Sequence, residues 1–224
     1  MILEVSDLHK TFVGRSGEKL TILTQISLSV EVGSSCALVG PSGSGKTTLL
    51  GLCAGLDSPT SGQITFDGQN LAELTEDERA QVRRSHMGFV FQNFQLIPNL
   101  TALENVMLPL ELASVPYAVA VKRGNSMLER VGLGARAKHL PTQLSGGEQQ
   151  RVALARAVVH QPKIIFADEP TGNLDAENSE KVTDMLFSLN RESKTSLVLV
   201  THNMELAGRT ERILALKGGR VVAP

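Results

Sequence analysis

The stretch from Gly40 to Thr47 constrains this chain more strongly than any other part of the sequence. Its residues, Gly-Pro-Ser-Gly-Ser-Gly-Lys-Thr, match the pattern GxxxxGK[ST] without a mismatch. Residues 36–39 before it form a short apolar run typical of a strand buried on both faces, and residues 47–56 after it have a helical pattern. Glycines let the backbone N–H groups of such a loop surround phosphate groups, and the helix adds positive partial charge at its N-terminus. A plain glycine-rich turn is the alternative, but it does not explain the strand–loop–helix order.

Composition limits the class of protein. The chain has 224 residues, with 22 Lys and Arg against 23 Asp and Glu, so its formal net charge is -1. A balance this close to neutral disfavours a nucleic-acid surface that works by charge alone, and we expect no nucleic-acid partner. The sequence has no apolar run of about 18 residues, the length that indicates a membrane-spanning helix, and its start does not resemble a secretory signal. Both cysteines, Cys36 and Cys53, lie in apolar stretches, which predicts reduced core residues of a cytoplasmic protein.

Short apolar runs alternate with helical patterns along the chain, which predicts an α/β fold with a mainly parallel sheet. We expect a hairpin turn at Asp67-Gly68, and two strands within residues 212–222 joined by Gly218-Gly219. Residues 101–139 resemble a helical insertion between strands. The other expected strands are at residues 26–30, 36–39, 64–66, 88–91, 163–167 and 196–200, and the expected helices are at residues 101–110, 117–131 and 176–191.

Two carboxylates follow the apolar strand pattern of residues 164–167. Successive strand residues point to opposite faces, so we expect Asp168 and Glu169 to have different tasks. Asp168 suits the Mg²⁺ shell of a phosphate-loop enzyme, and Glu169 suits polarisation of the attacking water. A helix N-cap or a surface salt bridge is the alternative for either acid.

The string LSGGEQQR at residues 144–151 is the most distinctive one. Ser145 and Glu148 form the S-x-x-E pattern of a capping box, which opens a helix reaching about His160. That pattern does not explain Gly146 and Gly147, because each glycine in a helix costs about 1 kcal/mol relative to alanine. Bare N–H groups at a helix start favour the close approach of an anion. Since the chain's own phosphate loop already holds a nucleotide, we expect this second site to face a nucleotide bound to another copy of the chain.

The motifs occur in the order found in ABC-transporter ATPase subunits, which the chain resembles over essentially all of its length. Shorter strings resemble the branch that serves lipoprotein release and macrolide efflux, and within it the YbbA-type subunits. They are GLD at 55–57, PTSG at 59–62, GFVFQ at 88–92 and DEPTGNLD at 168–175.

The resemblance implies one ABC ATPase domain over residues 1–224, built on a P-loop NTPase (RecA-like) α/β core. Residues 1–94 and 160–224 would form this core with an antiparallel β subdomain, and residues 95–159 an inserted α-helical subdomain that carries the signature motif.

The same resemblance implies ATP and Mg²⁺ as cofactors. Lys46 would reach the β- and γ-phosphates, and Thr47, Gln92 and Asp168 would lie at the metal. The residues implied in nucleotide binding are Phe12, Gly40, Pro41, Ser42, Gly43, Ser44, Gly45, Lys46, Thr47, Thr48, Gln92, Ser145, Gly146, Gly147, Glu148 and Asp175. The residues implied in catalysis are Glu169, His202, Lys46 and Gln92.

Several of these roles have a simpler alternative. Gln92 would sense the membrane partner, but it could be a solvated strand end. His202 would contact the γ-phosphate, but it could be a core or capping histidine, and Asn203 stands where many relatives carry aspartate. Phe12 would stack on adenine, but a core phenylalanine is almost as well supported. Asp175 would lie at the dimer seam.

The resemblance implies a head-to-tail homodimer that drives an integral membrane permease from the cytoplasmic face of the bacterial inner membrane. The permease would dock near the Gln92 loop and the helical subdomain, and a periplasmic partner would be reached through it.

The expected substrates are lipoproteins, lipids or other hydrophobic molecules of the periplasm or outer leaflet, moved by mechanical coupling. A regulatory ATPase that transmits force without transport is the alternative, whereas soluble ABC ATPases of DNA repair or translation need insertions that 224 residues do not hold. The apolar candidates for docking are Phe94, Leu96, Ile97, Leu100, Val106, Met107 and Leu110, each of which could instead be core.

Overall fold

The computed structural model describes residues 1–222 and divides into two compact units. The first unit holds Met1–Arg83 and Ser196–Pro224, and the second holds Arg84–Thr195. Residues 223–224, the last two of the predicted domain, lie outside the described part. The division into a core of residues 1–94 and 160–224 and a helical subdomain of residues 95–159 stays a prediction.

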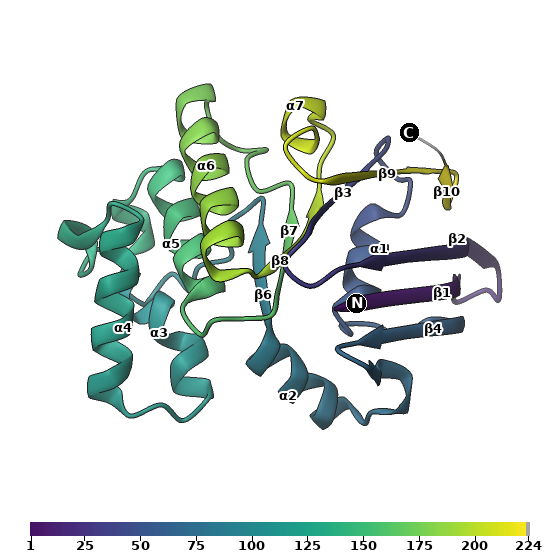
Figure 1. The fold of residues 1–224 in the computed structure, drawn as a ribbon, viewed down its shortest axis with the longest axis horizontal. Helices are drawn as coiled ribbons and strands as arrows, with labels where there is room; N and C mark the ends of the chain where they lie inside the picture. Colours follow the sequence, from purple (N-terminus) through teal and green to yellow (C-terminus); the bar gives the residue numbers. More distant parts are fainter. Residues whose placement is uncertain (223–224) are drawn as a thin grey trace. The chain divides into compact units, whose positions relative to one another are not determined.

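An antiparallel sheet forms one part of the first unit (Figure 1). It has the order β2-β1-β4-β5, from β1 (Leu3–Val13), β2 (Lys19–Val30), β4 (Ser61–Phe66) and β5 (Gln69–Asn70). The alternation of Ile26, Leu28 and Val30 buries one face of β2, as predicted. Asp67 and Gly68 have positive φ angles of 50° and 81° between β4 and β5, which confirms the predicted turn.

Parallel strands form the other sheet region of the first unit. β3 (Ser35–Val39) pairs in parallel with β8 (Ser196–Val200) and with β9 (Arg212–Lys217), which continues antiparallel into β10 (Arg220–Val222). All residues of β3 are buried, as its apolar run predicts for a strand covered on both faces. The unit also contains the helices α1 (Lys46–Cys53) and α7 (Met204–Ala207), the 3₁₀ turn Leu71–Glu73 and most of α2 (Glu76–His86).

The second unit combines two parallel strands with four longer helices (Figure 1). The strands are β6 (Met87–Phe91) and β7 (Ile164–Asp168). The helices are α3 (Ala102–Leu112), α4 (Tyr117–Arg130), α5 (Gly146–Val158) and α6 (Ala176–Ser193), with 3₁₀ turns at Gly134–Arg136 and Pro141–Gln143. The helices predicted at residues 101–110, 117–131 and 176–191 are therefore confirmed.

An apolar core joins α3, α4 and α5 within the second unit. Val106, Met107 and Leu110 of α3 are buried in it, with Leu128 of α4 and Val152 of α5. Leu96 packs against this core and only Ile97 of the docking candidates is a strongly exposed large apolar side chain, at 43%. The core interpretation is thus correct for Val106, Met107 and Leu110.

No described helix is both long enough and apolar enough to span a bilayer. Cys36 and Cys53 are buried and form no disulfide, as the sequence predicts. Burial raises the pKa of Cys36 to about 11 and that of Cys53 to about 12.

Both thiols are therefore expected to resist an alkylating or disulfide reagent in the native protein. At about pH 8, a pKa this high leaves almost no thiolate, the reactive form. Titration with a chromogenic disulfide should detect no thiol in the native chain and both after unfolding in guanidinium. A native titre of one thiol per chain would contradict this assignment.

Candidate functional site

The phosphate-loop sequence of the first unit forms a backbone cradle between β3 and α1. Gly40, Gly43 and Gly45 have φ angles of 152°, 76° and 98°, a region that residues with a side chain rarely adopt. A Cβ on Gly40 would lie 2.1 Å from the carbonyl oxygen of Leu216, so no side chain fits there. Beside Gly43, by contrast, no atom lies within 4 Å of a Cβ position. The glycines therefore shape the loop and leave its middle open to a ligand.

Polar groups inside this cradle suit an anion. The Lys46 ammonium donates to the carbonyl oxygens of Gly40, at 2.8 Å, and Pro41, at 3.0 Å. Ser44 is buried, and its hydroxyl has no hydrogen-bond partner among residues 1–222. Thr47 is exposed in the first turn of α1. Within the described residues, the loop thus combines a cation bonded to carbonyl oxygens, a hydroxyl without a partner and a helix N-terminus, which together fit the phosphates of a nucleotide.

His202 leaves the same edge of the sheet as the phosphate loop. Leu38 of β3 pairs with Val200 of β8 in parallel register, and Thr201 donates its N–H to Leu38. Because the carboxyl ends of parallel neighbours meet at one edge, His202 follows there beside Gly40. The histidine is exposed, which excludes the core alternative. The adjacent Asn203 is the cap instead, since its Oδ1 accepts from the N–H groups of α7.

Phe12 is also exposed, at 44%, so it is not a core phenylalanine. It lies opposite Leu20 in the hairpin of β1 and β2, and the Lys10 ammonium lies 4.7 Å from its ring centroid. Gly45 of the phosphate loop lies close to Ile22 of β2, since a Cβ on Gly45 would lie 3.2 Å from a methyl group of Ile22. The exposed ring therefore belongs to the hairpin that flanks the phosphate loop.

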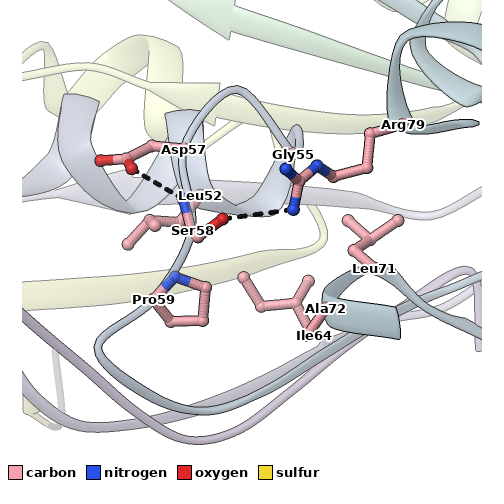
Figure 2. A pocket seen from close by; sticks show the side chains of 9 residues that line it. All are labelled: Leu52, Gly55, Asp57, Ser58, Pro59, Ile64, Leu71, Ala72 and Arg79. Carbon is pink, nitrogen blue, oxygen red and sulfur yellow. Dashed lines mark hydrogen bonds between the residues drawn. The ribbon is translucent and has the colours of Figure 1, made fainter. Parts of the chain in front are cut away.

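A small pocket follows α1 and is structural (Figure 2). Asp57 accepts the N–H of Ser58, and the guanidinium of Arg79 donates to the Ser58 hydroxyl. The cavity measures about 10 Å³, which is about the smallest volume that a single water molecule needs. It is too small for a nucleotide.

The acidic pair of the second unit lies at the ends of paired strands. Phe91 of β6 pairs with Asp168 of β7 in parallel register, so Gln92 and Glu169 follow at the same edge. The strand stops at Asp168, and Glu169 has a φ of 46°. The alternation of strand side chains therefore does not apply to Glu169, and a backbone turn sets its direction instead. Such a strained conformation is typical of functional sites.

Gln92 is exposed at a strand end, but its side chain is not merely solvated. Its Nε2 donates to Asn173 Oδ1 at 2.9 Å, and Asn173 Nδ2 donates to the Gln92 carbonyl at 3.1 Å. A Cβ on Gly172 would lie 2.8 Å from the same Nε2. Gln92 is thus bound to the segment that follows Glu169.

The capping box predicted at the start of α5 is present. Ser145 Oγ accepts from the Glu148 N–H at 3.3 Å, and the Glu148 carboxylate accepts from the Ser145 N–H at 2.8 Å. This bond from the Ser145 N–H lowers the pKa of Glu148 and keeps its carboxylate charged. The two glycines between them differ. Gly147 is buried, and a Cβ there would lie 2.2 Å from Asn178 Oδ1, whereas the nearest atom to a Cβ on Gly146 would be 3.6 Å away.

Packing therefore explains Gly147 and not Gly146. Asp175 lies next to this contact as the N-cap of α6, and its carboxylate accepts from the backbone N–H and the side-chain amide of Asn178, both at 2.8 Å. These hydrogen bonds lower the pKa of Asp175. The second unit thus gathers Gln92, Glu169, the start of α5 and Asp175 around one edge.

The sequence patterns did not predict a role for two polar residues of α5. Gln150 is fully buried, and Arg156 donates to the carbonyls of residues 94 and 95. The visible signal was a pair of polar side chains on a helix whose neighbours Val152, Ala153 and Ala155 are buried.

Comparison with known proteins agrees with this geometry. Residues 23–172 match the family described as ABC transporter. The chain is 52% identical to the uncharacterised ABC transporter ATP-binding protein YbbA of Escherichia coli K12, over 98% of this chain and 96% of that protein. It is 44% identical to the lipoprotein-releasing system ATP-binding protein LolD of Syntrophus aciditrophicus, over 99% of each. It is 46% identical to the macrolide export ATP-binding/permease protein MacB of Syntrophobacter fumaroxidans, over all of this chain and 31% of that protein.

Solved structures show the same fold. A dimeric post-hydrolysis state of the ATP-binding cassette MJ0796 bound to ADP and Pi has a TM-score of 0.90, with 41% identity over 99% of this chain and 97% of that one. A second dimeric MJ0796 structure, described as a bacterial ABC transporter cassette, has a TM-score of 0.91 and the same identity and coverage. The P-loop NTPase fold and the resemblance to the lipoprotein-release and macrolide-efflux branch are confirmed.

The two glycines of the capping box provide a matched stability test. Gly147→Ala should lower the free energy of unfolding by about 1–3 kcal/mol, because its methyl group must displace Asn178 from Asp175. Gly146→Ala should leave it unchanged or raise it by less than about 1 kcal/mol, because the site has room and alanine favours the helix. Urea unfolding of both variants checks this, and equal losses would show that packing restricts both positions.

Proposed function

Because this chain belongs to the ABC transporter family, as one of its ATPases, we propose that two copies close head to tail around two Mg-ATP molecules to drive a membrane permease. The observation that carries this proposal is the phosphate loop, whose open backbone cradle contains the unused Ser44 hydroxyl and the Lys46 ammonium. ATP hydrolysis is the family's activity; the roles of single residues below are our assignments.

The loop from Gly40 to Thr48 binds the phosphates of ATP. Lys46 leaves the loop carbonyls and bonds to the β- and γ-phosphates, which are stronger acceptors because they are charged. Thr47, Gln92 and Asp168 offer a hydroxyl, an amide and a carboxylate oxygen, the hard donors that Mg²⁺ prefers. Held by these three side chains, Mg²⁺ would supply positive charge beside the phosphates. Phe12 stacks on the adenine.

Glu169 acts as the general base for the attacking water. The Glu169 backbone has a positive φ, and the Gly172 N–H stabilises this turn by donating to the Glu169 carbonyl oxygen. Gln92, held by Asn173, orients the same water, and His202 contacts the γ-phosphate. Positioning and electrostatics account for most of the catalysis in phosphoryl transfer.

The start of α5 completes the site of the other copy. Ser145 presents its hydroxyl, and Gly146 presents a backbone with no side chain over it, while Glu148 fixes the turn by accepting the Ser145 N–H. Asp175 lies at the dimer seam. Two observations support this role. Packing does not require a glycine at position 146, and two relatives of known structure are dimers.

A permease is the proposed partner, at the cytoplasmic face of the inner membrane, with a periplasmic partner reached through it. Ile97 provides the exposed apolar contact beside the Gln92 loop. The proposed substrates are lipoproteins, lipids or other hydrophobic molecules of the periplasm or outer leaflet, moved by mechanical coupling. The names of two relatives, a lipoprotein-releasing LolD and a macrolide-export MacB, support this class. A regulatory ATPase that transmits force without transport is the second candidate, because it needs the same ATP site.

Glu169→Gln should retain ATP binding and lose hydrolysis. The amide cannot accept the proton of the attacking water, and a general base contributes on the order of 10²–10⁴-fold. Phosphate release and the equilibrium binding of a fluorescent ATP analogue measure the two effects separately. Hydrolysis at the wild-type rate would remove Glu169 from this role.

Ile97→Glu should weaken the binding of the permease, because it places a charge on the docking surface. We expect affinity for the permease, measured with the membrane protein that co-purifies with the chain, to fall about tenfold while ATP binding stays unchanged. The control is Val32→Glu, an equally apolar residue that is 67% exposed in the first unit. If the two variants bind the permease equally well, Ile97 is not part of the docking surface.

A further inference from the structure

Helix α5 contacts the catalytic loops of its own unit at several points beyond its N-terminus. Gln150 is fully buried, and its Nε2 donates to the carbonyl oxygen of Phe91 at 3.3 Å and to that of Pro170 at 2.5 Å. Phe91 directly precedes Gln92, and Pro170 directly follows Glu169. One amide therefore connects α5 to the backbone next to both residues.

Arg156, further along α5, holds the other side of the Gln92 loop. Its guanidinium donates to the carbonyl oxygens of Phe94, at 3.0 Å, and Gln95, at 2.7 Å. These two residues have φ angles of 60° and 48°, a conformation that costs energy for residues with a side chain. The arginine thus stabilises a turn that local preferences disfavour.

Stability alone does not account for Gln150. Its Oε1 is buried without a hydrogen-bond donor among residues 1–222, although buried polar atoms are normally satisfied. The buried Oε1 therefore destabilises the fold, whereas the Nε2 of the same amide donates hydrogen bonds to two carbonyl oxygens. Such local violations are typical of functional positions.

We propose that Gln150 and Arg156 are positioning residues that fix Gln92 and Glu169 relative to the start of α5. This proposal rests on the proposed function, in which Ser145 and Gly146 at that start bind the nucleotide of the other copy. A movement of α5 onto that nucleotide then moves both loops with it. Contact with one ATP thereby sets the catalytic groups of the other site.

Gln150→Met tests the proposal, because methionine fills a similar volume and cannot donate to either carbonyl. The matched control is Gln149→Met, since the Gln149 side chain donates to the carbonyl oxygen of Leu144, in the turn before its own helix, and among residues 1–222 to neither catalytic loop. We expect kcat to fall about tenfold or more in Gln150→Met, as misplaced catalytic groups do. The Kd for Mg-ATP and the Tm should match those of Gln149→Met, whose kcat should stay near that of the wild type.

A second pair keeps the proposal falsifiable if Gln150→Met does not fold. Lysine at position 156 retains a charged donor for one carbonyl, whereas methionine retains none. We expect kcat to decrease from wild type through Arg156→Lys to Arg156→Met, while the Kd for Mg-ATP stays constant. Equal kcat values in the two variants would contradict a positioning role.

The remaining outcomes separate the two claims. If the wild-type chain does not hydrolyse ATP, the proposed function fails. If it does and Gln150→Met keeps kcat within twofold, or loses kcat and ATP affinity in parallel, only the positioning role fails.

Discussion

Backbone carbonyls at the ends of β6 and β7 need hydrogen-bond donors, and the rest of the second unit depends on how α5 supplies them. The strands stop at Phe91 and Asp168, where the chain turns sharply and loses its ladder partners. Buried carbonyls left without donors are costly. Gln150 and Arg156 provide donors from one rigid helix, so the two loops share a single frame. In the proposed function, this frame positions Gln92 and Glu169.

In the first unit, the glycines of the phosphate loop determine how closely an anion can approach the backbone. Gly40 leaves no room for a side chain against Leu216, and Gly43 leaves open space. The same distinction separates Gly147, which packs on Asn178, from Gly146, which does not. In each motif one glycine has no room for a side chain, and another has room where a side chain would lie.

Local patterns predicted the parts of the structure that local physics decides. The buried strand before the phosphate loop and the capping box at Ser145 follow from residue order. Helix α2 was missed because none of its residues is buried, although Thr75 and Glu78 form a capping pair. The early start of β2 at Lys19 was missed for a similar reason, since its first residues are exposed.

The candidate site could be predicted only in part, because some of its contacts join residues that are distant in sequence. Motif spacing identifies the phosphate loop and the acidic pair, because each is continuous in sequence. The positive φ of Glu169 depends on the turn after the strand, and the partner carbonyls of Gln150 lie 59 and 20 residues away. Such contacts have no local signature. Sequence motifs therefore indicate the proposed reacting groups better than the residues that position them.

The central claim is that the nucleotide site is completed by a second copy of the chain. Light scattering of the hydrolysis-deficient Glu169→Gln variant at saturating Mg-ATP measures this most directly. The account predicts twice the mass of one chain with ATP, the mass of one chain without it, and loss of the dimer when Gly146→Asp is added. A single-chain mass with ATP fully bound would contradict it.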